Sequence, residues 1–282
     1  MIAMEYKEYK PHPLLSGNIE CYWSAYAESP PFREQESLIP DGTIELMFNF
    51  GDPYKQIIGG EKKLIKGSHV IGIRQEALKI SQTSRQDFFC IRFRPGGMFP
   101  FFRIPAHRFA NGFYTFEELL GPEYKAIEEK LFHARDNYIR VQIIEEYLFK
   151  KFTERLDDHR FVKQCLEVFA QTGSVQIQGL AERFNTNYKT IERKFAKVVG
   201  LTPSHFLKIR RFNRALFTIY SLKYKTLTEV ALDSGYYDQP HFNREFKQLT
   251  GLSPGNFLKE QFKIVEVIQP ALAGRLSNSY KL

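Results

Sequence analysis

The sequence predicts an α+β protein, with an N-terminal β-rich barrel or sandwich and trailing helices, followed by an all-α domain of two helix-turn-helix motifs joined by a linker helix. Three observations predict this fold. Residues 1 to about 115 contain short apolar runs at period two between Gly/Pro turns. Residues 115–152 repeat apolar side chains at spacings of three and four. Residues 160–262 contain an internal repeat.

The strand signals are strongest at two places in the N-terminal part. Residues 44–50 alternate apolar side chains after the turn Pro40-Asp41-Gly42, and residues 88–93 form a second run that Pro95-Gly96-Gly97 closes. Shorter strands are expected within 64–73 and 77–81. Thr115 is a candidate N-cap with acids after it, and helices are then predicted over 126–132 and 138–152.

The chain has 282 residues, about twice a typical domain length, so two domains are expected. We place the first domain at 1–155 and the second at 160–262, with a C-terminal tail at 263–282. The charged run at 153–159 is the predicted linker between the two domains.

Composition excludes several classes of protein. Apolar residues make up 43% and charged residues 26% of the chain, which is typical of a globular protein and not of a disordered or collagen-like one. Charges interrupt every stretch that approaches the ~18–20 apolar residues of a membrane helix, and the N-terminal segment lacks the apolar core of a signal peptide. Cys21, Cys90 and Cys165 are scattered, as in reducing compartments. We therefore expect a cytoplasmic protein without a membrane partner.

The positive charge is concentrated in one part of the chain. Residues 1–159 hold 21 Lys and Arg against 23 Asp and Glu, a net charge of −2, whereas residues 160–260 hold 16 against 8, a net charge of +8. Residues 261–282 add a net charge of +2. This asymmetry favours a nucleic-acid-binding domain joined to a nearly neutral one.

The internal repeat has two copies. An offset of 51 superposes Arg193 on Arg244, and it also superposes Phe195 on Phe246, Gly200 on Gly251, Pro203 on Pro254 and Phe206 on Phe257. Upstream, Ala181 and Ala231 are 50 residues apart, so one copy has a turn that is one residue longer. Each copy predicts two helices joined by a tight turn, with Asn187 and Asp238 capping the second helix of each pair.

A linker helix is predicted over 203–220, between the copies. Eighteen residues at ~1.5 Å rise span about 27 Å. Two recognition helices that enter successive major grooves lie about 34 Å apart. A helix of this length is therefore suited to hold two such helices on one face of a duplex.

Residues that could contact DNA are those on the second helices that do not point inward. Arg pairs with guanine, Asn with adenine and Glu with cytosine, and Lys favours phosphate. The alternative is that these are solvated surface charges. The predicted base-facing residues are Tyr188, Lys189, Glu192, Arg193, Gln239, Pro240, Asn243 and Arg244. The predicted phosphate-facing residues are Lys194, Lys197, Lys208, Lys225 and Lys247.

These motifs resemble the DNA-binding domain of the AraC/XylS family of bacterial transcription regulators, over residues 160–262. The resemblance implies two helix-turn-helix motifs, with second helices at 187–199 and 238–249, bound to a promoter. Departures are small: Tyr236 stands where Phe is usual and Leu258 where Arg is common. The matching residues are Arg210, Ala215, Gly235, Asp238, Phe242, Arg244, Phe246, Lys247, Gly251, Ser253, Pro254 and Phe257.

The N-terminal part resembles an uncharacterised domain that is often fused to this DNA-binding type. The matching features are Trp23, the turn at Pro40-Asp41-Gly42 with Glu45-Leu46 after it, and Phe93-Arg94-Pro95-Gly96-Gly97. By analogy, it would sense a small-molecule effector, mediate homodimerisation, or both. RNA polymerase is a further partner that the resemblance leaves open.

Other chemistry has little support in the sequence. No histidine has a partner at metal-ligand spacing, and no nucleophile, dinucleotide or phosphate-loop motif is present, so we expect no enzyme, metal or cofactor. Arg92 and Arg94 alternate with apolar residues and could bind an anionic effector, or they form an exposed or acid-paired strand face. The alternative function is a small-molecule-binding or processing protein with a non-specific basic anchoring module.

Overall fold

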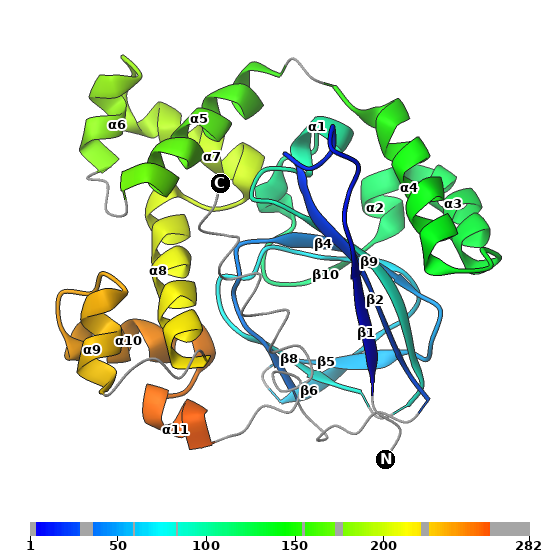
Figure 1. The fold of residues 1–282 in the computed structure, drawn as a ribbon, viewed down its shortest axis with the longest axis horizontal. Helices are drawn as coiled ribbons and strands as arrows, with labels where there is room; N and C mark the ends of the chain where they lie inside the picture. The colour runs from blue at the N-terminus through cyan, green and yellow to red at the C-terminus, as the bar shows by residue number, and fades with distance from the viewer. Residues whose placement is uncertain are drawn as a thin grey trace.

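The computed structural model describes residues 4–28, 36–58, 60–82, 84–153, 156–172, 177–220 and 226–259. A β-rich part with covering helices lies beside a helical part (Figure 1). The described strands of the β-rich part form two antiparallel sheets, in the orders β1-β2-β9-β4-β7-β10 and β3-β8-β5-β6. Of the two predicted β architectures, the sandwich is therefore the one adopted by the described strands. The strands are β1 (Glu5–Tyr9), β2 (Ile19–Ala27), β3 (Glu36–Leu38), β4 (Ile44–Asn49), β5 (Tyr54–Ile58), β6 (Glu61–Ile65), β7 (His69–Ile71), β8 (Leu78–Ser81), β9 (Gln86–Phe93) and β10 (Phe113–Thr115).

The two strongest predicted strands lie side by side at the centre of the six-stranded sheet. They are β4 and β9, which pair in a register that sets Ile44 opposite Phe93 and Phe48 opposite Phe89. Both faces of β4 are buried, because Leu46 packs in the main core and Met47 packs in a second core between the sheets. The period-two pattern over 44–50 therefore identified the face of β4 that packs in the main core, and the opposite face of the strand is buried as well.

The helices after the strands begin at the predicted cap. Glu118 of α2 (Phe116–Leu120) accepts a hydrogen bond of 2.8 Å from the backbone N–H of Thr115. The predicted helices over 126–132 and 138–152 are confirmed as α3 (Tyr124–Phe132) and α4 (Asn137–Lys151). The short helix α1 (Phe99–Phe102) precedes them, with single turns at Ala106–Arg108 and Gly121–Glu123.

The predicted linker at 153–159 is partly wrong, because helix α5 (Asp157–Thr172) already begins within it. Asp157 and Asp158 lie in the first turn of α5, where acidic side chains interact favourably with the helix dipole. The charged run at 153–159 therefore contains the start of α5 as well as the connection between the two parts.

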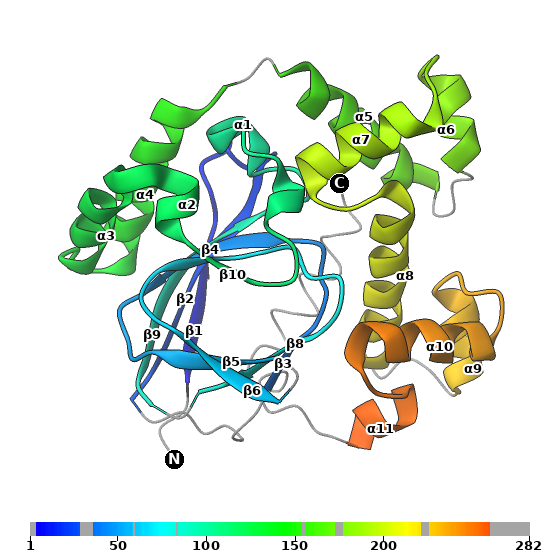
Figure 2. The ribbon, with the colours of Figure 1, turned by 180° about the vertical axis from the view of Figure 1, so that it is seen from behind.

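The helical part contains both copies of the repeat. Helix α7 packs near the start of α8 and α10 packs further along it, and the C-terminal ends of both helices point toward the β sandwich in both views (Figures 1 and 2). The predicted tail at 263–282 lies outside the described residues. The helices are α6 (Ile177–Arg183), α7 (Tyr188–Val199), α8 (Pro203–Tyr220), α9 (Leu227–Asp233), α10 (Gln239–Thr250) and α11 (Pro254–Lys259).

Candidate DNA interface

The first helix-turn-helix motif is formed by α6 and α7. Asn185 adopts a left-handed conformation with φ of 45°, and the N–H of Thr186 donates to the carbonyl of Ala181 at 2.9 Å. Asn187 caps α7, since its side chain accepts from the N–H of Thr190 at 2.9 Å. The inward face of α7 is the predicted one, with Ile191, Phe195 and Val198 all buried.

The second motif, α9 and α10, repeats this turn with one residue more. Gly235 takes the left-handed position with φ of 87°, and the N–H of Tyr236 donates to Ala231 at 3.0 Å. Asp238 caps α10 by accepting from the N–H of His241 at 2.7 Å. The additional residue is Tyr237, whose side chain is 88% exposed. The predicted difference in turn length and both predicted caps are confirmed.

Helix α8 connects the motifs, and its predicted bounds are confirmed. Its buried stripe lies at helical spacing and continues the cores of both motifs, because the ring of Phe206 packs on Phe195 of α7 and the ring of Phe212 packs on Phe246 of α10. The stripe is Phe206, Ile209, Phe212, Asn213, Leu216 and Ile219. The two motifs are thus parts of one packed unit.

The predicted base-facing residues lie on the outward sides of α7 and α10. Arg193 and Arg244 are both exposed, as are Tyr188, Lys189 and Pro240, whereas Glu192, Gln239 and Asn243 are half-buried. Partial burial and a hydrogen bond to the Glu192 carboxylate raise the pKa of Tyr188. Each motif therefore presents its arginine at the equivalent position, together with a different set of polar neighbours.

Most of the predicted phosphate-facing lysines have protein partners. Lys194 and Lys197 lie 3.2 and 2.7 Å from the two carboxylate oxygens of Asp158 on α5, and their hydrogen bonds lower the pKa of Asp158. Lys208 donates to Gln248 at 2.6 Å. Lys247 is exposed, and Lys225 lies outside the described residues. Sequence reasoning did not find Asp158, because its contact with α7 spans 39 residues.

A second polar cluster that the sequence did not predict joins α8 to α10. Arg211 donates to both carboxylate oxygens of Glu245, at 2.7 and 2.9 Å, and the His241 ring lies 3.0 Å from the same carboxylate. The contact between His241 and Glu245 could have been found from the sequence, because the two residues are four apart on one helix. The contact of Arg211 with Glu245 could not, because Arg211 lies on another helix. The cluster fixes α10 relative to α8.

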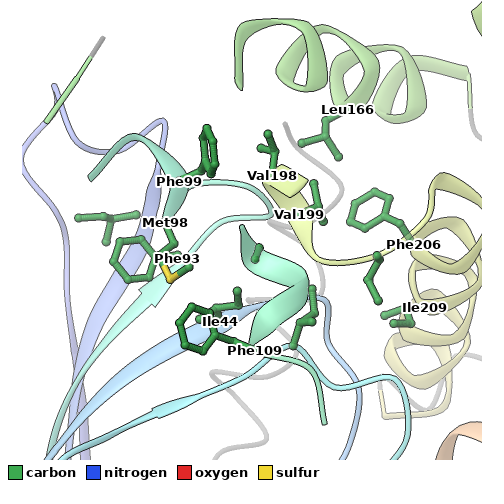
Figure 3. Close-up of a cluster of buried hydrophobic side chains, with 14 of the residues drawn as sticks. Ile44, Phe93, Met98, Phe99, Phe109, Leu166, Val198, Val199, Phe206 and Ile209 are labelled. Atoms are coloured by element: carbon green, nitrogen blue, oxygen red, sulfur yellow. The ribbon is translucent and has the colours of Figure 1, made fainter. Parts of the chain in front are cut away.

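The β sandwich contacts the same unit at several points (Figure 3). Val198 and Val199 at the end of α7 lie between Phe99 on one side and Leu166 and Phe206 on the other. Gly200, which follows α7 in the chain, lies so close to the sandwich that an added Cβ would be 3.0 Å from the Ile73 side chain and 3.1 Å from the Ala106 carbonyl oxygen.

The first half of α8 and the C-terminal end of α10 contact the sandwich too. A Cβ on Gly42 would lie 3.8 Å from side-chain atoms of both Phe206 and Ile209. The N–H of Ala77 donates to the Leu249 carbonyl at 2.9 Å. The C-terminal ends of both recognition helices are therefore fixed to one body, and their N-terminal ends point away from it.

The two arginines proposed for an effector have different surroundings. Arg92 is 7% exposed and pairs with Glu45, which also accepts from the Trp23 indole N–H at 3.3 Å. Arg94 follows the end of β9 and donates to the Ser16 carbonyl at 2.8 Å. Of the readings that the sequence left open, acid pairing describes Arg92. Effector binding by these residues stays a prediction.

Two further features are absent from the described ranges. No three His, Cys, Asp or Glu side chains within those ranges gather as metal ligands would. None of the helices described there is both long and apolar enough to cross a membrane.

Comparison with known proteins matches two families. Residues 180–260 match a helix-turn-helix domain family, and residues 7–114 match a domain of unknown function. Residues 180–260 are an AraC-type helix-turn-helix domain. The predicted resemblance is thereby confirmed for both parts of the chain.

The chain is also similar to curated proteins and solved structures. An uncharacterized HTH-type transcriptional regulator of Haemophilus influenzae is 26% identical over 132 residues, which are 45% of this chain and 44% of that protein. The chain thus spans less than half the length of that relative. Apo ToxT from Vibrio cholerae is 12% identical, with 84% of this chain and 96% of that chain covered and a TM-score of 0.44. EutQ of Clostridium difficile covers 33% of this chain and 63% of its own, with 11% identity and a TM-score of 0.24.

Proposed function

We propose that this chain is a sequence-specific DNA-binding regulator of transcription, in which α7 and α10 read two successive major grooves of a promoter and the N-terminal domain controls the reading. The observation that carries the proposal is the placement of the two helices. Both are anchored to the β sandwich at their C-terminal ends, and both expose an equivalent arginine, Arg193 or Arg244, on the outward side.

The separation of the helices supports reading on one face of DNA. The 18 residues of α8 span about 27 Å at ~1.5 Å per residue, and this helix carries α7 near its start, at Phe206, and α10 further along, at Phe212. Successive major grooves on one face are about 34 Å apart. We propose that packing on one rigid helix sets the two recognition helices at that distance.

The charges assign different tasks to different residues. Arg193 and Arg244 would donate to guanine, while Lys189 and Lys247, which are exposed, would contact the phosphates or base edges within reach. Lys194 and Lys197 would exchange Asp158 for phosphate. That exchange costs little, since ion pairs at the surface contribute about 0–1 kcal/mol each.

Control by the N-terminal domain follows from its contacts with both motifs. The sandwich touches the C-terminal ends of α7 and α10 and the first half of α8, so any change in its shape reaches all three helices. A small-molecule effector, a second copy of the chain and RNA polymerase are the partners that such a regulator would use. Arg92 and Arg94 remain the proposed anion-binding residues.

A mobility-shift assay on genomic fragments tests the proposal. We expect one or a few fragments to bind at least tenfold more tightly than bulk DNA, with a footprint of two sites one helical turn apart. Replacing Arg244 by Ala removes a bidentate contact worth about 1–3 kcal/mol and should relax base preference in one half-site. Equal affinity for every fragment would overturn sequence-specific regulation and favour a non-specific basic anchoring module.

A further inference from the structure

The second recognition helix begins with a glutamine that the preceding helix holds. The Thr228 hydroxyl on α9 donates a hydrogen bond of 2.5 Å to the side-chain oxygen Oε1 of Gln239, the first residue of α10. A glutamine needs both its oxygen and its nitrogen to bind adenine in bidentate fashion. Because this hydrogen bond turns Oε1 toward α9, the amide nitrogen Nε2 is turned away from α9 and is the group that Gln239 offers to DNA.

One turn further along α10, the Asn243 side chain also presents its amide nitrogen and not its oxygen. Its Oδ1 is buried and has no hydrogen-bond partner among the described residues, so the accessible end of the amide is the nitrogen. The neighbouring Arg244 is exposed, and a guanidinium carries donors only. The three polar side chains of α10 that are predicted to face bases, Gln239, Asn243 and Arg244, therefore present N–H groups.

We propose that α10 presents a donor-only surface that reads guanine-rich sequence, with Thr228 as the residue that positions Gln239. Guanine offers two acceptors in the major groove, O6 and N7, whereas adenine and thymine offer one each and the cytosine amino group offers none. This proposal rests on the proposed function. It also replaces the expectation that Asn243 reads adenine, because the buried Oδ1 cannot accept from the adenine amino group.

The first recognition helix differs in the equivalent positions. Glu192 of α7 stands where α10 has Asn243, and its carboxylate accepts from the Tyr188 hydroxyl while keeping further acceptor capacity. A carboxylate can accept from the cytosine or adenine amino group. The two half-sites of the operator are therefore expected to differ, and the first half-site serves as an internal control for changes made in the second motif.

Selection of binding sites from randomised duplex DNA tests the role of Thr228. For the wild-type chain we expect guanine at two or more positions of the second half-site. Thr228→Val keeps the shape of the side chain and removes the hydroxyl, so the Gln239 amide can turn and present both its oxygen and its nitrogen, and adenine becomes acceptable at one position. Thr228→Ser restores the hydroxyl and should restore the wild-type preference. The first half-site should be unchanged in all three proteins, and equal melting temperatures verify that each is folded.

Modified duplexes test the acceptor chemistry with the wild-type chain. Replacing guanine by 7-deazaguanine keeps the base pair and removes the N7 acceptor, and at the second half-site it should weaken binding about two- to tenfold per position, as expected for half of a bidentate contact. Adenine-rich second half-sites in the selection, or no effect of 7-deazaguanine there, would overturn the inference while leaving sequence-specific binding intact. No sequence preference at all would overturn both the inference and the proposed function.

Discussion

Gly200 and Gly251 occupy the same position in the two copies of the repeat. Substituting each of them by Ala and comparing the losses of stability measures the energy of the contact between the β sandwich and the end of α7. Both residues follow a recognition helix in the left-handed conformation, with φ of 90° and 79°. They differ in their surroundings. A Cβ on Gly200 would lie 3.1 Å from the Ala106 carbonyl oxygen, whereas a Cβ on Gly251 would have no heavy atom within 4 Å.

The magnitudes follow from these two facts. Alanine in the left-handed conformation costs roughly 1–2 kcal/mol, and this cost applies to both variants. The added methyl at Gly200 must also displace backbone atoms of the sandwich, and overpacking of this kind costs about 1–3 kcal/mol. We therefore expect Gly200→Ala to lower the free energy of unfolding by about 2–5 kcal/mol and Gly251→Ala by about 1–2 kcal/mol.

Urea unfolding of both variants, followed by circular dichroism, is the assay for stability. DNA binding provides a second readout, because loosening α7 from the sandwich should reduce affinity for a two-site duplex more than affinity for a duplex carrying one half-site. Equal destabilisation by the two substitutions would refute the reasoning, since it would mean that the contact between Gly200 and Ala106 carries no energy.

Three further predictions concern single side chains. Burial lowers the pKa of His69 to about 4, so the stability gained by keeping it neutral is complete above pH ~6.5 and is lost as the pH falls toward 4. The free energy of unfolding should be about 2 kcal/mol lower at pH 5 than at pH 7, and His69→Gln should reduce this difference. Glu45→Ala leaves Arg92 buried without its ion-pair partner and should cost about 3–5 kcal/mol in chemical unfolding, whereas an effect below about 1 kcal/mol would contradict burial of the pair. Lys247→Ala should weaken binding to all DNA sequences alike and reduce the slope of log affinity against log salt by about one, unlike Arg244→Ala, which should alter base preference.

The sequence predicted features that depend on neighbours along the chain. Alternation over 44–50 and the apolar run over 88–93 located β4 and β9. The repeat located both recognition helices, their caps Asn187 and Asp238, and the additional turn residue. These features are determined within a few residues by side-chain period, backbone hydrogen bonding and the left-handed residue in each turn. Such determinants can be detected without a structure.

Features that depend on contacts between distant segments were not predictable. Glu45 neutralises Arg92 because antiparallel pairing of β4 with β9 sets the two residues opposite each other, and register between separate strands is not visible in either strand alone. Asp158 meets Lys197 because α5 packs on α7. The adenine-reading role expected for Asn243 took its outward position into account, but not the burial of its Oδ1.

The exposed arginines limit how an N-terminal domain can control DNA binding in the proposed regulator. Arg193 and Arg244 are accessible while the sandwich contacts both motifs, so docking of the sandwich does not mask the residues that would read bases. The sandwich instead contacts the C-terminal end of each recognition helix, at Gly200 and at Leu249. A ligand or partner that shifts one of these contacts would change the separation and angle of the two helices. Because two-groove binding depends on both quantities at once, a small displacement would alter affinity for the paired site while leaving affinity for each half-site almost unchanged.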